Sequence, residues 1–254
     1  MFQIIPLPAF NDNYIWVISA ADHSGIAVVD PGDADVVKAY LKENDLTLAA
    51  ILITHHHNDH TGGVAELASS GNVPVYGPAN SPFTGITHPL SDNDTVILFG
   101  QQLQIKAIPG HTLDHISYYA DKQLLCGDTL FLAGCGRLFE GTPAQMQDAM
   151  NYFKTLPDDT EVYCTHEYSL ANLVFAAAVE PDNEAIKAVV KHCENLRSDD
   201  KPTLPTSIAQ EKQINPFMRT SEASVCKAGE LFSGQALKSE VEVLTAIREW
   251  KNQF

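Results

Sequence analysis

The chain has 254 residues, of which 44% are hydrophobic, 8% aromatic and 19% charged, and this balance excludes the disordered and fibrous classes of protein. The 32 acidic residues against 16 basic residues give a formal net charge of −16. Such a surface repels a phosphate backbone, so we expect no nucleic-acid partner. Five dispersed cysteines without a C-x-x-C pair favour a reducing cytoplasm over a disulfide framework.

The N-terminal segment does not have the features of a signal peptide. It lacks a basic start, and Pro6, Pro8, Asn11 and Asp12 interrupt its apolar run. No apolar stretch approaches the roughly 20 residues that a membrane-crossing helix needs. We therefore expect a cytoplasmic protein with no membrane partner, and we expect it to be a monomer.

Residues 1–165 are dominated by short β-rich runs separated by turn residues. The predicted strands are YIWVIS, IAVVDPGD, AAILIT, VPVYGP, TVILF, LQIKAIPG, HISYYA, KQLLCGD and EVYCT. Between ILIT and VPVY, the segment TGGVAELASSG has apolar residues at helical spacing and predicts a helix that ends near Gly71. Several connections are too short for parallel crossovers, so we expect mixed sheets with helices outside.

A further helix is predicted from Thr142 to about Lys154. Pro143 stands at its first helical position, and Gln145 lies three residues after Thr142, which is the spacing of a capping box.

Residues 166–254 favour helix instead of strand. The helical segments are YSLANLVFAAAVE, NEAIKAVVKHCENLRS, SEASVCKAGELF and LKSEVEVLTAIREWKNQF. The segment SDDKPTLPTSIAQEKQINPFMR contains Pro202, Pro205 and Pro216, and we expect it to be an extended connector. The sequence thus predicts two domains: a strand-rich domain over residues 1–165 and an α-helical domain over residues 166–254.

The strongest chemical signal is the segment LITHHHNDHTGG, which follows an apolar strand. Residues two apart on an extended backbone point the same way, so His55 and His57 can aim their imidazoles at one point while His56 points elsewhere. Asp59 and His60 begin the turn into the next helix and can reach a second point nearby. The pattern therefore predicts two adjacent metal half-sites.

Three further clusters follow predicted strands. They are IPGHTLDH with His111 and His115, LLCGDTL with Asp128, and VYCTHEY with His166. Taken alone, each histidine is more often a hydrogen-bonded boundary residue, and each Gly-Asp is more often a turn. Together with H-x-H-x-D-H they predict a metal site assembled from strand ends, because chance assembly of all four clusters is improbable.

The succession T-H-x-H-x-D-H, G-H-T, G-D-T and a late histidine resembles the metallo-β-lactamase superfamily. GCGRLFEGT at 134–142, HEY at 166–168 and NPFMR at 215–219 resemble the hydroxyacylglutathione hydrolases, or glyoxalase II. The resemblance implies an α+β fold: an αββα sandwich of two mixed β-sheets flanked by helices, followed by a smaller α-helical domain. It implies hydrolysis of S-D-lactoylglutathione to glutathione and D-lactate, the second step of methylglyoxal detoxification.

The resemblance also implies the metal ligands. One metal ion would be held by His55, His57 and His111 and the other by Asp59, His60 and His166, with Asp128 bridging the two. Asp59 and Asp128 would serve in catalysis, and Asp30 and His115 would orient ligand histidines. A donor set of imidazoles and carboxylates without thiolate suits zinc, with iron and manganese as alternatives.

A glutathione thioester brings carboxylates toward an acidic protein, so binding needs local cations. Arg137 is one, and Arg248 and Lys251, three residues apart on the last helix, can hold a carboxylate together. Cations near a helix C-terminus also complement the helix dipole without any other role. Phe139 and Tyr168 are either pocket walls or core aromatics. Arg137 and Phe139 stand where the family often has lysine and tyrosine.

Two other classes of function stay open. One is a different activity of the same superfamily: a β-lactamase, a phosphodiesterase or a glutathione persulfide dioxygenase. The other is a non-catalytic metal-binding protein, for which a complete ligand set that retains Asp59 would be unexpected. Metal analysis combined with a thioester assay separates them.

Overall fold

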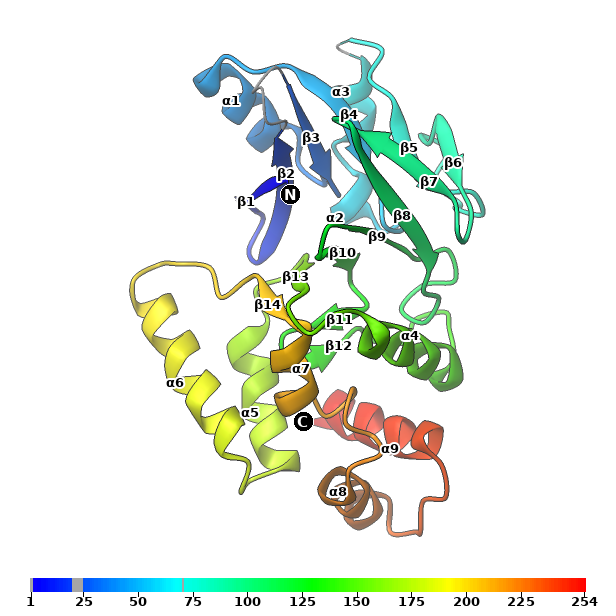
Figure 1. Cartoon of the computed structure of the whole chain (residues 1–254), viewed down its shortest axis with the longest axis vertical. Helices are drawn as coiled ribbons and strands as arrows, with labels where there is room; N and C mark the ends of the chain where they lie inside the picture. Colours follow the sequence, from blue (N-terminus) through cyan, green and yellow to red (C-terminus); the bar gives the residue numbers. More distant parts are fainter. Residues whose placement is uncertain (1, 20–24, 70) are drawn as a thin grey trace. The chain divides into compact units, whose positions relative to one another are not determined.

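The computed structural model describes residues 2–19, 25–69 and 71–254 (Figure 1). The chain consists of two compact units, Met1–Ile108 with Asp114–Gly127, and Pro109–Leu113 with Asp128–Phe254. The expected domain boundary at residues 165 and 166 falls inside the second unit and stays a prediction.

The first unit contains a six-stranded sheet whose strands lie in chain order. They are β1 (Gln3–Ala9), β2 (Asn13–Ser19), β3 (Ile26–Val29), β4 (Leu48–Leu52), β5 (Val75–Pro78) and β6 (His88–Leu90). β1, β2 and β3 pair antiparallel, whereas β3, β4, β5 and β6 pair parallel, so the sheet is mixed. Pro6 and Pro8 are tolerated in β1 because this strand lies at the edge of the sheet.

Helices pack on this sheet through one buried cluster. Ile15, Val28 and Ile51 of the sheet meet Val37 of α1 (Ala34–Asn44) and Leu67 of α3 (Val64–Ser69). The short helix α2 (Asn58–Thr61) lies between β4 and α3 along the chain. The residues between β4 and α2 therefore begin at the end of a strand that is anchored in the core.

A second set of strands in the first unit runs in the order β10-β9-β8-β7. The strands are β7 (Thr95–Leu98), β8 (Gln101–Ala107), β9 (Ile116–Ala120) and β10 (Gln123–Gly127), and all three pairs are antiparallel. Phe99–Gly100 and Asp121–Lys122 join neighbouring strands with positive φ at both residues. Two-residue hairpin loops of type I′ require this backbone conformation. The connection from β8 to β9 is longer and carries His111.

The second unit contains most of the helices. Its elements are β11 (Leu130–Phe131), β12 (Gly134–Cys135), α4 (Pro143–Thr155), β13 (Glu161–Cys164), α5 (Ser169–Val179), α6 (Glu184–Ser198), β14 (Thr206–Ser207), α7 (Ile208–Ile214), α8 (Ala223–Ser233) and α9 (Glu240–Gln253). α4 begins with the predicted capping box, in which Thr142 and Gln145 satisfy each other's backbone N–H groups.

The expected extended connector between α6 and α8 is wrong in part. It contains the two-residue strand β14, which pairs with β13, and the helix α7. Pro205 and Pro216 lie just outside these elements, so neither proline interrupts them. The Ser207 hydroxyl accepts a hydrogen bond from the Gln210 N–H and caps α7. A short helix thus forms between two prolines.

Within the residues that the structure describes, no helix combines the length and the apolar character that crossing a bilayer requires.

Candidate metal centre

The chemically active side chains predicted from the sequence follow four strands. His55, His57, Asp59 and His60 come after β4 in the first unit. His111 follows β8, Asp128 follows β10 and His166 follows β13, and these three belong to the second unit. We call the first set the histidine cluster and the second set the Asp128 cluster.

The histidine cluster converges as expected. His55 Nε2 lies 3.1 Å from His57 Nδ1, and the rings of His55 and His60 are 4.0 Å apart. Asp59 Oδ2 lies 3.4 Å from His60 Nε2 and accepts a hydrogen bond of 3.0 Å from Asn13 Nδ2. Since β4 ends at Leu52, a bend followed by the start of α2 brings these groups together.

Asp30 lies against His60. Asp30 Oδ2 lies 3.0 Å from His60 Nδ1, and both side chains are buried. A carboxylate this close favours a proton on Nδ1, which leaves the Nε2 lone pair available for a metal ion. Asp30 is itself held by the Thr54 N–H at 2.8 Å and the Thr54 hydroxyl at 2.7 Å. The structure thus places Asp30 where an orienting residue belongs.

His56 and His115 lie beside the histidine cluster with other partners. His56 Nδ1 lies 2.9 Å from Asp114 Oδ1, and Asp114 also accepts a hydrogen bond of 2.7 Å from the Ser81 hydroxyl. The His115 ring stacks on the His55 ring at 4.6 Å, and its Nδ1–H donates to the Ile116 carbonyl oxygen at 3.1 Å. His56 therefore directs its Nδ1 toward Asp114, while its ring lies 5.0 Å from the His57 ring.

The Asp128 cluster is centred on one carboxylate oxygen. Asp128 Oδ2 lies 3.5 Å from His111 Nε2 and 3.2 Å from His166 Nε2. His111 Nδ1 lies 2.8 Å from the carbonyl oxygen of Arg137. A carbonyl oxygen only accepts, so Nδ1 carries the proton and the Nε2 lone pair faces Asp128. All three side chains are buried.

These donors fit transition-metal ions. Both clusters combine imidazole nitrogens with carboxylate oxygens, and the chain groups several of its histidines and acidic residues in this way. In His111, a hydrogen bond at Nδ1 leaves Nε2 as the ligand atom, and in His60 the Asp30 carboxylate lies 3.0 Å from Nδ1. Ligand histidines in metalloproteins are characteristically held in this manner. The chain thus carries clustered histidines and aspartates that can bind metal.

Family comparisons agree with this chemistry along the whole chain. The model for the metallo-beta-lactamase superfamily matches residues 10–166, and the model for the hydroxyacylglutathione hydrolase C-terminus matches residues 167–254. Hydroxyacylglutathione hydrolases from Vibrio cholerae serotype O1 and Aliivibrio fischeri are 49% and 51% identical to the chain, with 100% of both chains covered in each comparison. The chain belongs to the hydroxyacylglutathione hydrolase family.

Solved structures support the same fold. ETHE1 from Myxococcus xanthus matches with a TM-score of 0.68 and 25% identity, over 98% of this chain and 91% of that chain. The BLEG-1 B3 metallo-beta-lactamase matches with a TM-score of 0.63 and 26% identity, over 86% of this chain and 99% of that chain. The predicted metallo-β-lactamase fold with a helical C-terminal region is confirmed, and the family is one of metal-dependent hydrolases.

Two aromatics predicted to bind substrate lie beside the Asp128 cluster. Tyr168 stacks on His166 at 4.7 Å with an interplanar angle of 3°. Phe139 meets His111 edge to face at 5.3 Å and is 63% exposed, so it is not a core aromatic. Arg137, two residues before Phe139, is also exposed.

The predicted cations of α9 have unequal surroundings. Arg248 is 4% exposed, donates to the Cys135 carbonyl oxygen at 2.8 Å and lies 5.2 Å from the centre of the Phe217 ring. Lys251 is partly buried, with Nζ 5.0 Å from the centre of the Phe175 ring. Burial, followed by the charges of Arg248 and Arg137, lowers the pKa of Lys251 to about 8. The three cations thus form one positive region.

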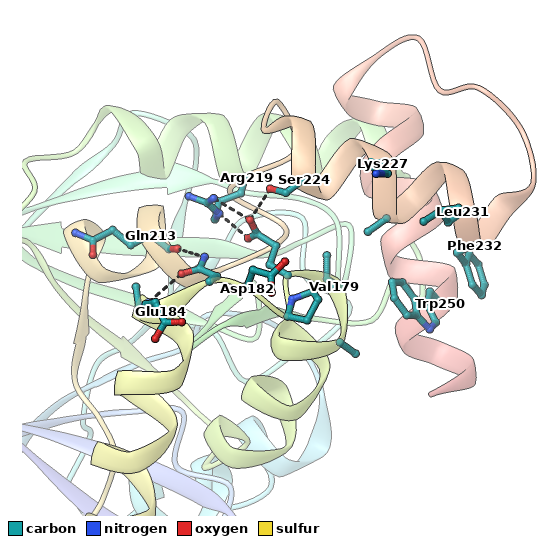
Figure 2. A pocket seen from close by; sticks show the side chains of 16 residues that line it. Val179, Asp182, Glu184, Gln213, Arg219, Ser224, Lys227, Leu231, Phe232 and Trp250 are labelled. Atoms are coloured by element: carbon teal, nitrogen blue, oxygen red, sulfur yellow. Dashed lines mark hydrogen bonds and ion pairs between the residues drawn. The ribbon is translucent and has the colours of Figure 1, made fainter.

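A groove of about 1140 Å³ in the second unit involves none of these predicted residues. Figure 2 shows its walls, with Trp250 and Phe232 at one end and Arg219 at the other. Arg219 forms hydrogen bonds of 2.8 and 2.9 Å with the two carboxylate oxygens of Glu180, and Ser224 donates to Glu180 at 2.6 Å. The charges of Arg219 and Glu180 at this end of the groove therefore neutralise each other.

Sequence reasoning missed the residues that support the ligands. Asn13 holds Asp59, and Thr54 holds Asp30. Asn13 precedes the ligand motif by more than 40 residues and is the first residue of β2, so nothing in its local pattern indicates this role. Thr54 directly precedes His55, and its polar side chain at the end of an apolar strand was a sequence signal that could have indicated a supporting role.

Proposed function

We propose that this protein hydrolyses the thioester bond of S-(2-hydroxyacyl)glutathione, with S-D-lactoylglutathione yielding glutathione and D-lactate. The observation that carries the proposal is the match to hydroxyacylglutathione hydrolases over the whole chain, joined to a complete set of imidazole and carboxylate donors. The reaction would be the second step of methylglyoxal detoxification. If the proposal fails, the alternatives are another activity of the superfamily or a non-catalytic metal-binding role.

The proposed cofactor is a pair of divalent transition-metal ions, with zinc favoured and iron or manganese as alternatives. One ion would be held by His55, His57 and His111, and the other by Asp59, His60 and His166, with Asp128 between them. The convergence within each cluster supports this assignment, as do the hydrogen bond at His111 Nδ1 and the Asp30 carboxylate 3.0 Å from His60 Nδ1.

When bound, such ions would lower the pKa of a bound water to roughly 7 and would stabilise negative charge on a carbonyl oxygen. Asp59 would orient that water. Its carboxylate is 43% exposed and is held by Asn13, so its direction is fixed while one side stays open. Proton acceptance by a carboxylate in this position would aim the attack on the thioester carbonyl.

The leaving group explains why a thioester suits this chain. A thiol has a pKa near 8.5 and departs as thiolate without protonation, whereas an amine leaving group needs a general acid. We find no acid among the described side chains of either cluster that is placed to protonate a leaving amine. The donor set therefore favours thioester over amide hydrolysis.

The glutathione part of the substrate is proposed to bind in the second unit. Arg137, Arg248 and Lys251 supply positive charge to a carboxylate, and Phe139 and Tyr168 supply exposed aromatic surface next to His111 and His166. The pKa of Lys251, near 8, keeps its ammonium charged at neutral pH. We further propose that the protein works in the cytoplasm as a monomer, on a small-molecule substrate, without nucleic-acid or membrane partners.

The deciding experiment compares substrates on purified protein of measured metal content. We expect two metal ions per chain and rapid hydrolysis of S-D-lactoylglutathione, with no turnover of a β-lactam or a phosphodiester. Asp128→Asn should lower both the metal content and the rate, because this carboxylate faces both His111 and His166. Asp148→Asn, at an exposed position on α4, is the matched control. A fully loaded protein that leaves the thioester intact would overturn the proposal.

A further inference from the structure

The hairpin formed by β11 and β12 connects the candidate ligand Asp128 to Arg137, whose backbone orients the candidate ligand His111. It begins two residues after Asp128 and ends two residues before Arg137, whose carbonyl oxygen receives the His111 Nδ1–H. Gly136, directly after the hairpin, packs so closely that an added Cβ would lie 2.0 Å from the Asp128 carbonyl oxygen and 3.0 Å from His111 Nδ1. A displacement of the hairpin therefore displaces both Asp128 and His111.

Side chains from the helical region hold the backbone of this hairpin. Asn215 Nδ2 lies 3.1 Å from the Phe131 carbonyl oxygen and 2.9 Å from that of Gly134. Glu211 Oε2 accepts the Ala133 N–H at 2.8 Å. Asn172 adds a bond of 3.0 Å to the Leu132 carbonyl oxygen, and Arg248 adds one of 2.8 Å to that of Cys135. Glu211 and Asn215 make three of these five bonds.

Glu211 and Asn215 are locked against each other. Asn215 Oδ1 accepts the Phe217 N–H at 3.0 Å, which fixes the amide so that Nδ2 faces the hairpin. Asn215 Nδ2 also donates to Glu211 Oε2 at 2.9 Å, and the Thr206 hydroxyl donates to Oε1 at 2.7 Å. Both residues are 0% exposed. The pair is therefore a rigid clamp with one defined geometry.

The clamp holds a strained turn. Ala133, at the tip of the hairpin, has φ of 53°, a left-handed conformation that is strained for a residue other than glycine. Its N–H is the group that Glu211 accepts. The tip therefore keeps its conformation because a fixed acceptor stands opposite it.

Burying Glu211 has an energetic cost that an apolar residue would avoid. Burial raises the pKa of this carboxyl to about 7, although Thr206, Asn215 and the Ala133 N–H stabilise its charged form. A buried carboxylate without a cation is destabilising unless its hydrogen bonds are complete, and such groups are retained where they specify one geometry.

We propose that Glu211 and Asn215 are positioning residues for the metal centre, because they fix the β11–β12 hairpin and, through it, Asp128 and the carbonyl oxygen that orients His111. The proposal rests on the proposed function only in that Asp128 and His111 are taken as metal ligands. It gives the N-P-F-M-R segment a role in preparing the metal site from the helical region.

The test measures zinc affinity by competition with a chromophoric chelator. Glu211→Gln keeps the size of the side chain but replaces one accepting oxygen with an NH₂ group, which faces the hydrogen-bond donors around Glu211. We expect about a tenfold loss of zinc affinity or more, the magnitude typical of residues that orient metal ligands. Glu180→Gln is the matched control, since it makes the same charge change in a buried carboxylate of this unit that contacts Arg219 and Ser224 and not the hairpin. It should lower the melting temperature and leave zinc affinity within about twofold.

A rescue separates positioning from general stability. Adding Ala133→Gly to Glu211→Gln should restore much of the zinc affinity, because glycine adopts positive φ without a clamp. Asn172→Ala removes a single hydrogen bond to the hairpin and replaces Glu211→Gln as the test variant if Glu211→Gln does not fold. It should lower zinc affinity several-fold. Wild-type zinc affinity in these hairpin variants, or equal losses in Glu211→Gln and Glu180→Gln, would overturn the proposal. Failure of the wild type to hydrolyse the thioester would overturn only the proposed function.

Discussion

At His111, a single hydrogen bond decides which nitrogen is free to bind metal. Its Nδ1–H donates to the Arg137 carbonyl oxygen, so Nε2 presents its lone pair beside Asp128. At His60, the Asp30 carboxylate lies 3.0 Å from Nδ1. Both partners are distant in sequence from the histidine they contact. The chemical state of each ligand is therefore set by neighbours that the local motif does not contain.

His56 provides a test of ligand choice within the run of three histidines. His55→Ala and His57→Ala should each lose metal, because these imidazoles converge, whereas His56→Ala should keep both metal and most activity. His56→Ala should still destabilise the fold by about 1–3 kcal/mol, since buried Asp114 loses a partner. Metal analysis and thermal unfolding of the three variants check this. Equal metal loss in all three would refute the assignment.

Lys251 should give substrate binding a dependence on alkaline pH. Burial and the nearby cations lower its pKa from 10.5 to about 8, so the ammonium is charged at pH 7 and is lost as the pH rises through 8. If it holds a substrate carboxylate, KM should rise by up to about tenfold between pH 7 and 9 with little change in kcat.

Lys251→Arg is the matched control, because a guanidinium does not titrate in this range. Its KM should stay level to pH 9. Steady-state kinetics with correction for spontaneous thioester hydrolysis measure both profiles. A level profile in the wild type would remove Lys251 from the binding site.

Among the elements, local sequence specified some boundaries almost to the residue. The capping box of Thr142 and Gln145 starts α4, and an asparagine or serine side chain caps α6, α7 and α9. The sequence interpretation missed α1, even though Asp33 caps it and Val37 and Leu41 lie at helical spacing. It also missed β1, β6 and the two-residue strands β11, β12 and β14, since runs this short or interrupted by proline lack a periodic pattern.

The cap of α4 should contribute measurably to stability. Thr142→Ala removes the oxygen that accepts the Gln145 N–H and should cost about 1 kcal/mol. Thr142→Ser keeps a hydroxyl and should cost less. Denaturant unfolding of both variants at equal metal loading measures the difference. If Thr142→Ala left the free energy of unfolding unchanged, water would be replacing the cap without loss of stability.

On the scale of the whole molecule, metal binding should couple to folding. Ions that bind the native state and not the unfolded chain stabilise by about 2.7 kcal/mol when the free metal is 100 times the dissociation constant. Chelation should therefore lower the melting temperature, and added zinc should restore it. Acidification should have the same effect, because imidazole ligates only when neutral. Calorimetry with and without chelator tests this. An unchanged melting temperature would show that the donors bind no metal.

The sequence by itself determined the family, the fold class and the residues able to ligate metal. These are encoded locally: apolar runs make strands, and H-x-H-x-D-H follows one of them. Only the tertiary structure decided that the Arg137 carbonyl oxygen accepts the His111 Nδ1–H, that Asp30 lies against His60, that Arg248 is buried against Cys135, and that Glu211 and Asn215 clamp the β11–β12 hairpin. These contacts join residues as many as 113 positions apart. Hydrogen-bond partners at such separations follow from packing, which no local spacing records.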